Sequence, residues 1–324
     1  MGEVDIKSKA YLGQADVFAD VFNYYIYGGQ QVICPERLQA CDITEISVPY
    51  GTDSFGSEIQ RYRDLLKTAV TMKDDETAYI LLGIEAQQRV HYAIPVQNML
   101  YDAMQYAKQV EQVAVYHRNA RDWKGKSSGE FLSGFYKEDK LLPVITLVLL
   151  LSDETWDGPV SLHEMIKVQD KQILDLIPDY RVHLIAPSDL DDEKLSRFHT
   201  SIREVMEFIK YSKDRKRLQE ITKGNYHYQI MDRKAVELLN SCVKAGIEIK
   251  QDEEEIDVCQ AIEEMKMEER LEGRIEGARE KLLQNLGSLM KTLGLTPEQA
   301  MDALQVPESD RLEYWALLEN QSCF

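Results

Sequence analysis

Two carboxylates and one amide in the first third of the chain have the types and spacing of a catalytic site. Asp64 ends the run 61–64, and Glu85 and Gln87 stand at the end of an apolar run. Residues two apart on a strand point to the same face, so Glu85 and Gln87 would face one way and an acid from a neighbouring strand could meet them. With the backbone carbonyl of Ala86, the two carboxylates make an oxygen-only site, which suits Mg²⁺, Mn²⁺ or Ca²⁺.

Such a site suits the hydrolysis of a phosphodiester. A hard cation can activate water and neutralise the charge that develops on the phosphate, and the amide could orient the attacking water. The alternative is that Glu85 is a strand-end side chain in solvent and that Asp64 pairs with Arg61 or Arg63. Segment 59–70 fits a strand or a helix. A site built on Asp64 fails if that residue lies in mid-helix, far from Glu85.

The elements that would position these residues alternate between strands and helices. Apolar spacing and the pair Gly28-Gly29 predict a helix over 15–27, and Pro95 is expected to open another, through about residue 109. Alternation of this kind predicts an α/β sheet rather than a sandwich. The inward side of the second helix is expected to carry Val96, Met99, Leu100, Ala103, Met104 and Tyr106. The other expected elements are strands at 43–48, 79–84, 143–151 and 180–186, and helices at about 191–212 and 234–245.

The last third of the chain predicts a series of helices. Residues 251–280 hold 12 acids against 4 bases, a net charge of −8, which is typical of a solvated helix or linker. Within this stretch, Glu272–Arg279 predicts an exposed helix weakened by two glycines. An amphipathic helix over 282–293 follows, and Thr296 has the spacing of a capping box that opens another. A last helix is expected over 311–318.

These patterns divide the chain into three expected parts. They are a main domain over 1–225, a helical extension with an acidic linker over 226–280, and a small helical module over 281–324.

Composition and charge exclude several classes of protein. The 324 residues carry a net charge of −18, which argues against a generally basic nucleic-acid coat but not against an enzyme that meets DNA through a local patch. Five cysteines without C-x-x-C spacing argue against a zinc site and for a reducing compartment. The longest apolar run, Leu141–Leu151, is too short to cross a bilayer. We therefore expect a cytoplasmic protein with no membrane partner.

Many short stretches, in order, resemble the recombination-promoting nuclease and transposase-like family, a branch of the PD-(D/E)XK nuclease superfamily. The resemblance covers about residues 10–225, and the repeated Glu-Gly-Arg and residues 294–296 are similar to the usual tail of that family. The stretches are 18–23, 32–35, 63–64, 83–87, 91–95, 101–103, Tyr106 with Gln109, 142–145, and 156–159 with Leu162.

The resemblance implies a metal-dependent DNA endonuclease of recombination or mobile-element type, with a restriction-endonuclease-like core in which helices flank a mixed sheet. Asp64 and Glu85 would be the metal carboxylates, with Mg²⁺ as the first choice of ion. Gln87 would fill the position that lysine holds in most of the superfamily. The helix before the sheet would add Asp20, for which an exposed helix acid is the alternative. Asp16, one turn earlier, is expected to be a helix N-cap.

Two further expectations concern partners. The most basic cluster could contact DNA phosphates, with a solvated helix end as the alternative; it consists of Lys210, Lys213, Arg215, Lys216 and Arg217. The C-terminal helices are acidic, so we expect them to serve homo-oligomer assembly rather than DNA reading. In the alternative, the protein has a nuclease fold but no catalytic activity and acts as a DNA- or protein-interaction scaffold.

Overall fold

The computed structural model describes residues 2–41, 44–47, 59–62, 64–73, 76–168 and 170–321. The chain divides into two compact units, residues 1–259 and 260–324, which are described separately below. The boundaries expected at 225/226 and 280/281 stay a prediction.

A five-stranded mixed sheet forms the centre of the first unit in its described part, in the order β1-β4-β5-β6-β7. Strands β4 and β5 form an antiparallel hairpin, whereas β5, β6 and β7 run parallel to one another. The expected α/β class and its mixed sheet are confirmed. The strands are β1 (Gln39–Ala40), β4 (Leu65–Lys73), β5 (Glu76–Gln87), β6 (Val144–Leu150) and β7 (His183–Ile185); β2 (Thr44–Ser47) and β3 (Ile59–Tyr62) pair separately, as do β8 (Met231–Asp232) and β9 (Glu255–Ile256).

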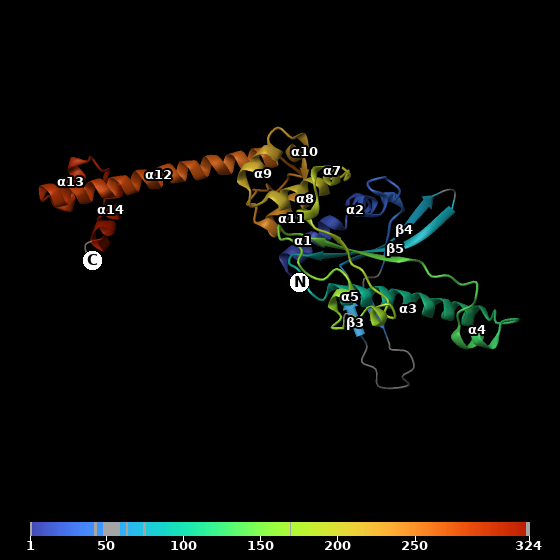
Figure 1. Cartoon of the computed structure of the whole chain (residues 1–324). Helices are drawn as coiled ribbons and strands as arrows, with labels where there is room; N and C mark the ends of the chain where they lie inside the picture. The colour runs from blue at the N-terminus through green and yellow to red at the C-terminus, as the bar shows by residue number, and fades with distance from the viewer. Residues whose placement is uncertain are drawn as a thin grey trace. The chain divides into compact units, whose positions relative to one another are not determined.

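Helices cover both faces of this sheet (Figure 1). On one face lies α3 (Ile94–Ala120), where Asp102 accepts a hydrogen bond from Thr146 of β6. On the other face lie α1 (Glu3–Leu12) and α2 (Ala15–Tyr27), where Lys67 of β4 donates to the carbonyl of Gly13 between them. The sheet is therefore the middle layer of a three-layer unit.

The remaining helices of the first unit are short and connect or follow the strands. They are η1 (Pro35–Arg37), α4 (Ser128–Ser133), α5 (Leu162–Met165), α6 (Lys171–Leu174), η2 (Pro187–Asp189), α7 (Asp192–Leu195), α8 (Ile202–Tyr211), α9 (Arg215–Thr222), α10 (Tyr226–Gln229) and α11 (Arg233–Val243). No helix within the described ranges is both long enough and apolar enough to cross a bilayer.

Local sequence patterns predicted the positions of several of these elements. The helix expected over 15–27 is α2, and Gly28 ends it in the left-handed conformation with φ of 64°. The expected strand at 79–84 lies within the longer β5, and the helix expected to end near 109 continues to Ala120 as α3.

The single helix expected over 191–212 is wrong. The chain forms α7 and α8 instead, with residues 196–201 between them. The carboxylate of Asp20 accepts hydrogen bonds from the backbone N–H groups of His199 and Thr200, at 2.8 Å each. A continuous helix would need these two N–H groups for its own hydrogen bonds to the carbonyls four residues earlier, so their bonding to Asp20 interrupts the helix.

The second unit is built on one long helix. The exposed helix expected over 272–279 and the amphipathic helix expected over 282–293 are parts of a single α12 (Val258–Leu293). Two shorter helices follow, α13 (Pro297–Ala303) and α14 (Glu308–Gln321). The capping box predicted at Thr296 is confirmed, because Thr296 accepts from the N–H of Gln299 and the Gln299 side chain accepts from the N–H of Thr296.

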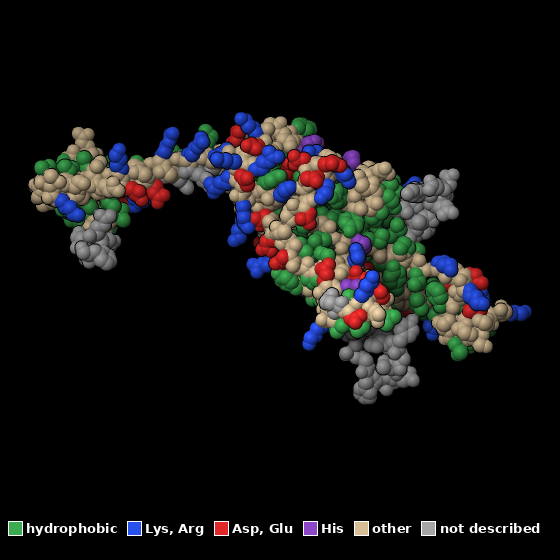
Figure 2. All heavy atoms as spheres, viewed as in Figure 1, with side chains coloured by type: hydrophobic (Ala, Val, Ile, Leu, Met, Phe, Trp, Pro, Cys, Tyr) green, Lys and Arg blue, Asp and Glu red, His purple; other side chains and the backbone are tan. Residues whose placement is uncertain are grey.

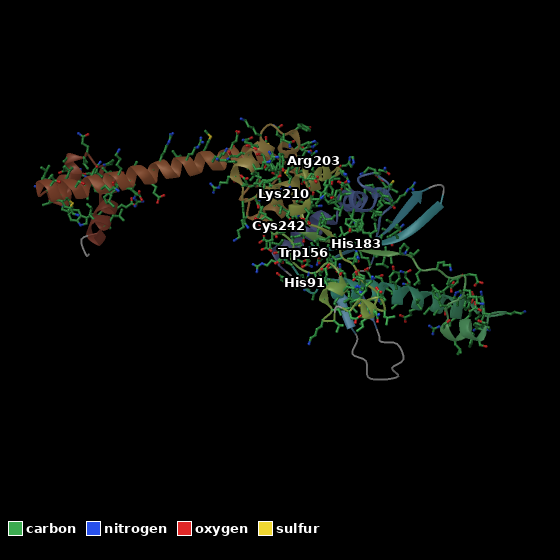
Figure 3. All side chains as sticks on the ribbon, viewed as in Figure 1. His91, Trp156, His183, Arg203, Lys210 and Cys242 are labelled. Carbon is green, nitrogen blue, oxygen red and sulfur yellow. The ribbon has the colours of Figure 1, made fainter. Side chains whose placement is uncertain are left out.

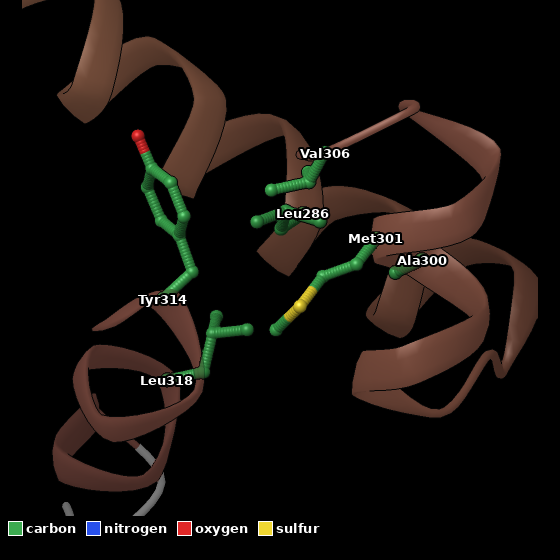
Figure 4. Packing of buried hydrophobic residues seen from close by; sticks show 6 residues of the cluster. All are labelled: Leu286, Ala300, Met301, Val306, Tyr314 and Leu318. Carbon is green, nitrogen blue, oxygen red and sulfur yellow. The ribbon is translucent and has the colours of Figure 1, made fainter. Parts of the chain in front are cut away.

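The apolar core of the second unit is small and formed by all three helices. Leu286 of α12 is fully buried at its centre. Figure 4 shows Leu286 with its neighbours in this core, which are Ala300, Met301, Val306, Tyr314 and Leu318.

Candidate functional site

The β4–β5 hairpin brings Asp64 next to the segment that carries Glu85. Leu65 pairs with Ile84 at the end of the ladder, and Asp64 immediately precedes β4. The Asp64 carboxylate accepts a hydrogen bond of 2.9 Å from the N–H of Ala86. In its described part, segment 59–70 therefore contains strands rather than a helix, and Asp64 does not lie in mid-helix.

The carbonyl of Ala86 lies on the same side as Asp64. In a strand, the N–H and C=O of one residue point toward the same neighbouring strand. The Ala86 N–H is bonded to Asp64, whereas the next carbonyl, that of Gln87, accepts from Leu151 after β6 at 2.7 Å. The Asp64 carboxylate and the carbonyl of Ala86 therefore lie on the same side of β5, near its C-terminal end.

Lys9 of α1 is the observed partner of Asp64. Its ammonium lies 3.1 Å from Oδ1 of Asp64 and 3.2 Å from Asp5. Partial burial lowers the pKa of Lys9, but the two carboxylates outweigh that effect, so the pKa of Lys9 is raised. The sequence offered Arg61 or Arg63 as the partner of Asp64; Arg63 lies outside the described residues. The Asp64 carboxylate therefore has the Lys9 ammonium as a positively charged neighbour.

Glu85 is not the solvent-exposed side chain that the alternative expected. Only 3% of Glu85 is exposed, and it lies on the sheet face that α3 covers. Gln87 follows on the same face and is half-buried. A carboxylate so deeply buried requires a compensating charge or hydrogen bonds.

A buried polar row on α3 covers this face and was missed by sequence reasoning. Asp102 accepts from Thr146 at 2.6 Å and from Tyr180 at 2.7 Å. One turn before it, Asn98 is completely buried, and neither atom of its side-chain amide has a hydrogen-bond partner. Leaving such a group unpaired costs about 1–3 kcal/mol, so Asn98 has hydrogen-bonding capacity to spare.

The inward face predicted for this helix is wrong for two of its members. Val96 and Ala103 are exposed, whereas the helix buries Asn98, Asp102 and Gln105. The available signal was the spacing of Ile94, Asn98 and Asp102, which recur every four residues on one side of the helix. That line points to the sheet because Ile94 packs against Val148, the register partner of Glu85.

Asp20 holds a different position. It is 1% exposed, and its Oδ2 accepts from Thr200 Oγ1 at 2.8 Å in addition to the two backbone N–H groups before α8. The alternative of an exposed helix acid is wrong, and Oδ1 is buried without a hydrogen-bond partner. Asp16 lies in the first turn of α2, and the N-cap position belongs to Gln14, so the predicted cap is wrong. Among the described residues, no three His, Cys, Asp or Glu side chains form a metal-binding group.

Acidic groups offset much of the basic cluster. Lys213 pairs with Asp153 at 2.7 Å, and Arg217 pairs with Glu220 at 3.2 Å. Lys210 on α8 (Figure 3) donates to the carbonyl of Leu190. The surface near α7 and α9 shows acids and bases interspersed rather than one basic patch (Figure 2). Arg215 and Lys216 complete the cluster on α9.

The donor set fits a hard divalent cation. Carboxylate and carbonyl oxygens are the ligands that Mg²⁺ and Mn²⁺ prefer, and Mg²⁺ keeps several waters when one or two carboxylates hold it. Asp64, Glu85 and the carbonyl of Ala86 supply this chemistry, and Gln87 stands next to it. Searches of protein-family models, curated proteins and solved structures found no match to the chain.

Proposed function

We propose that the protein is a divalent-metal-dependent DNA endonuclease that hydrolyses phosphodiester bonds. The observation that carries the proposal is the hydrogen bond from the N–H of Ala86 to the Asp64 carboxylate, with the buried Glu85 directly before Ala86 in β5. The substrate class, and the recombination or mobile-element role, rest on the family resemblance of residues 10–225. The proposal places the reaction in the cytoplasm.

Each residue of the site has a distinct part in this proposal. Asp64 and Glu85 would hold the cation, and the carbonyl of Ala86 would be a third protein ligand. When bound, a divalent ion there would supply Lewis-acid stabilisation and lower the pKa of a bound water. Gln87 orients the attacking water through its amide. Asn98, whose amide is unpaired, can donate to a water or a phosphate oxygen at the buried end.

Lys9 supplies a positive charge next to Asp64. Two carboxylates that share a site repel each other, and a nearby ammonium would reduce that repulsion. In this proposal Lys9 would keep its ion pair with Asp5 when Asp64 holds a cation.

The silent scaffold is the second candidate, and two observations favour it. Lys213, Arg217 and Lys210 are engaged by the protein's own acids or carbonyls, which reduces the charge available for DNA phosphates. Asp20 also does not join the two carboxylates in a group of three.

The test is titration of Mn²⁺ and Mg²⁺ into the protein by calorimetry, with a plasmid-nicking assay on the same samples. We expect Glu85→Gln to remove Mn²⁺ binding and to lower nicking by at least about a hundredfold, since a lost catalytic ion costs a large share of the rate. The matched control is Glu204→Gln, a change at another buried glutamate on α8, which should leave both unchanged.

Two results would decide against the endonuclease. Nicking that is equal in Glu85→Gln and the unaltered protein would assign the activity to a contaminant. An unaltered protein that binds no Mn²⁺ and nicks no DNA at millimolar Mn²⁺ would favour the scaffold.

A further inference from the structure

The long helix α12 carries one apolar seam along its length. Counting from Met267 in repeated steps of four, four and three residues, every position as far as Leu293 is apolar. Steps of four, four and three make an eleven-residue repeat, or about 3.67 residues per turn, which keeps a seam nearly straight along an α-helix. The seam therefore runs from Met267 to the C-terminal end of the helix.

Only the C-terminal half of this seam is covered within the chain. Leu286 is fully buried against α13 and α14, and Leu282 and Leu289 pack on the same core. The N-terminal half is bare: Met267 is 72% exposed, Leu271 59% and Ile275 60%. Three large apolar side chains in one line on a surface helix are unusual unless a partner covers them.

The bare half belongs to a helix that has little stability of its own. Gly273 and Gly277 lie within it, and each lowers helix stability by about 1 kcal/mol relative to alanine. Nothing lies within 4 Å of the position that a Cβ would occupy at either glycine. Neither glycine is therefore required by close packing in the chain alone, and pairing with another helix would compensate for the weak propensity.

The charges beside the bare seam are sorted by side. At about 100° per residue, Arg270, Arg274 and Lys281 follow one edge of the seam. Positions 268, 272 and 276, all glutamate in the sequence, follow the other edge. Arg279, on the acidic side, is engaged by Glu313 of α14.

This arrangement of charges favours a second copy of the same helix as the partner, and it favours a parallel orientation of the two helices. When two identical helices pair in parallel, the left edge of one meets the right edge of the other, so arginine faces glutamate. In an antiparallel pair, like edges meet, and arginine would face arginine. We propose that residues 267–278 are a self-association surface through which two copies of this chain form a parallel two-helix dimer.

The first test is the mass of the full-length protein by light scattering after size-exclusion chromatography at micromolar concentration. The chain is 37.4 kDa, so the dimer has a mass of about 75 kDa. Leu271→Glu should raise the dissociation constant by at least about tenfold, the size of effect at an interface hot spot. Leu312→Glu is the matched control, because Leu312 is 85% exposed on α14 outside the seam. It should leave the dimer intact.

The second test determines whether the two helices are parallel or antiparallel, according to whether a charge reversal weakens or strengthens the dimer. The double variant Arg270→Glu with Arg274→Glu places glutamate against glutamate in a parallel dimer and should weaken it. The same variant would relieve arginine–arginine repulsion in an antiparallel dimer and strengthen it. A photo-reactive phenylalanine at position 267 should cross-link near residue 267 of the second copy.

Three outcomes would overturn the proposal. They are a monomer at every micromolar concentration, a dimer that Leu271→Glu leaves unchanged while circular dichroism shows an intact fold, and cross-links from position 267 to residues 275–282.

Discussion

At the scale of single residues, the buried acids of this protein divide into two kinds. Asp20 and Asp102 are each fixed by hydrogen bonds to segments far away in sequence, and both serve to join elements. Asp64 instead accepts a hydrogen bond from Ala86, the residue after Glu85, and an ammonium lies beside its carboxylate. Burial alone therefore does not distinguish a structural acid from a candidate ligand; the identity of the neighbouring groups does.

The role of Asp20 can be tested through stability. Asp20→Ala leaves the N–H groups of His199 and Thr200 and the Thr200 hydroxyl without their acceptor. We expect the free energy of unfolding to fall by about 3 kcal/mol, because buried donors without partners are costly. Asp20→Asn keeps one acceptor oxygen and should lose less. The measurement is urea unfolding followed by circular dichroism.

Asp16 provides the control for this experiment, since it is exposed on the same helix. Asp16→Ala should change the free energy of unfolding by no more than about 0.5 kcal/mol. If Asp20→Ala is equally mild, Asp20 does not hold α2 to the segment before α8.

At the scale of elements, the far end of α3 is held by a histidine rather than by apolar packing. The two ring nitrogens of His117 lie 2.8 Å from Asp122 and 3.0 Å from Asp139. Its ring also stacks on Tyr136 with centroids 3.7 Å apart. The hydrogen bond to Asp122, followed by that to Asp139, raises the pKa of His117 above its usual 6.5.

This contact predicts a pH dependence confined to the region of α4. A raised folded-state pKa stabilises the fold fully below the unfolded pKa, and that stabilisation is lost as pH rises through the folded value. We therefore expect hydrogen exchange of residues 128–139 to accelerate, beyond the intrinsic pH effect, as pH rises from about 6 to above the raised pKa. An NMR titration of His117 would locate the midpoint.

The His117→Asn variant is the control, because it removes the side chain that titrates. It should remove the extra pH dependence and leave residues 128–139 less protected at pH 6. A titration midpoint below 6.5, or a pH dependence that persists in the variant, would show that His117 does not hold this end of the helix.

At the scale of the whole molecule, the two compact units have separate apolar cores. The core of the second unit contains few buried side chains, so each of them supports a large share of its stability. The first unit has a sheet enclosed by helices and a much longer list of buried residues. The two units should therefore respond separately to a change in one core.

Leu286→Ala tests this separation. A buried leucine replaced by alanine costs about 2–5 kcal/mol, enough to unfold a core as small as that of residues 260–324. We expect the melting transition of the second unit to disappear or fall sharply in calorimetry, while that of the first unit stays in place. Leu312→Ala, at an exposed leucine of the same unit, should shift neither. A shift of both transitions together would show that the chain unfolds as one unit.

Local interactions explain what the sequence alone determined. The helix over 15–27 and the capping box at Thr296 depend on residues within one or two turns, so their patterns predicted them. The alternation of strands and helices likewise predicted an α/β sheet. The pairing of Glu85 and Gln87 on one face follows from strand geometry alone, whatever the neighbouring strand.

Contacts between distant residues decided the rest. Whether Asp64 reached the end of β5 depended on a hairpin register, and the inward face of α3 depended on hydrogen bonds from Thr146 and Tyr180 to Asp102. The break between α7 and α8 depends on Asp20, nearly 180 residues earlier. Asp20 and Asp102 are stabilised by partners that come from other elements, and spacing along one element does not identify those partners.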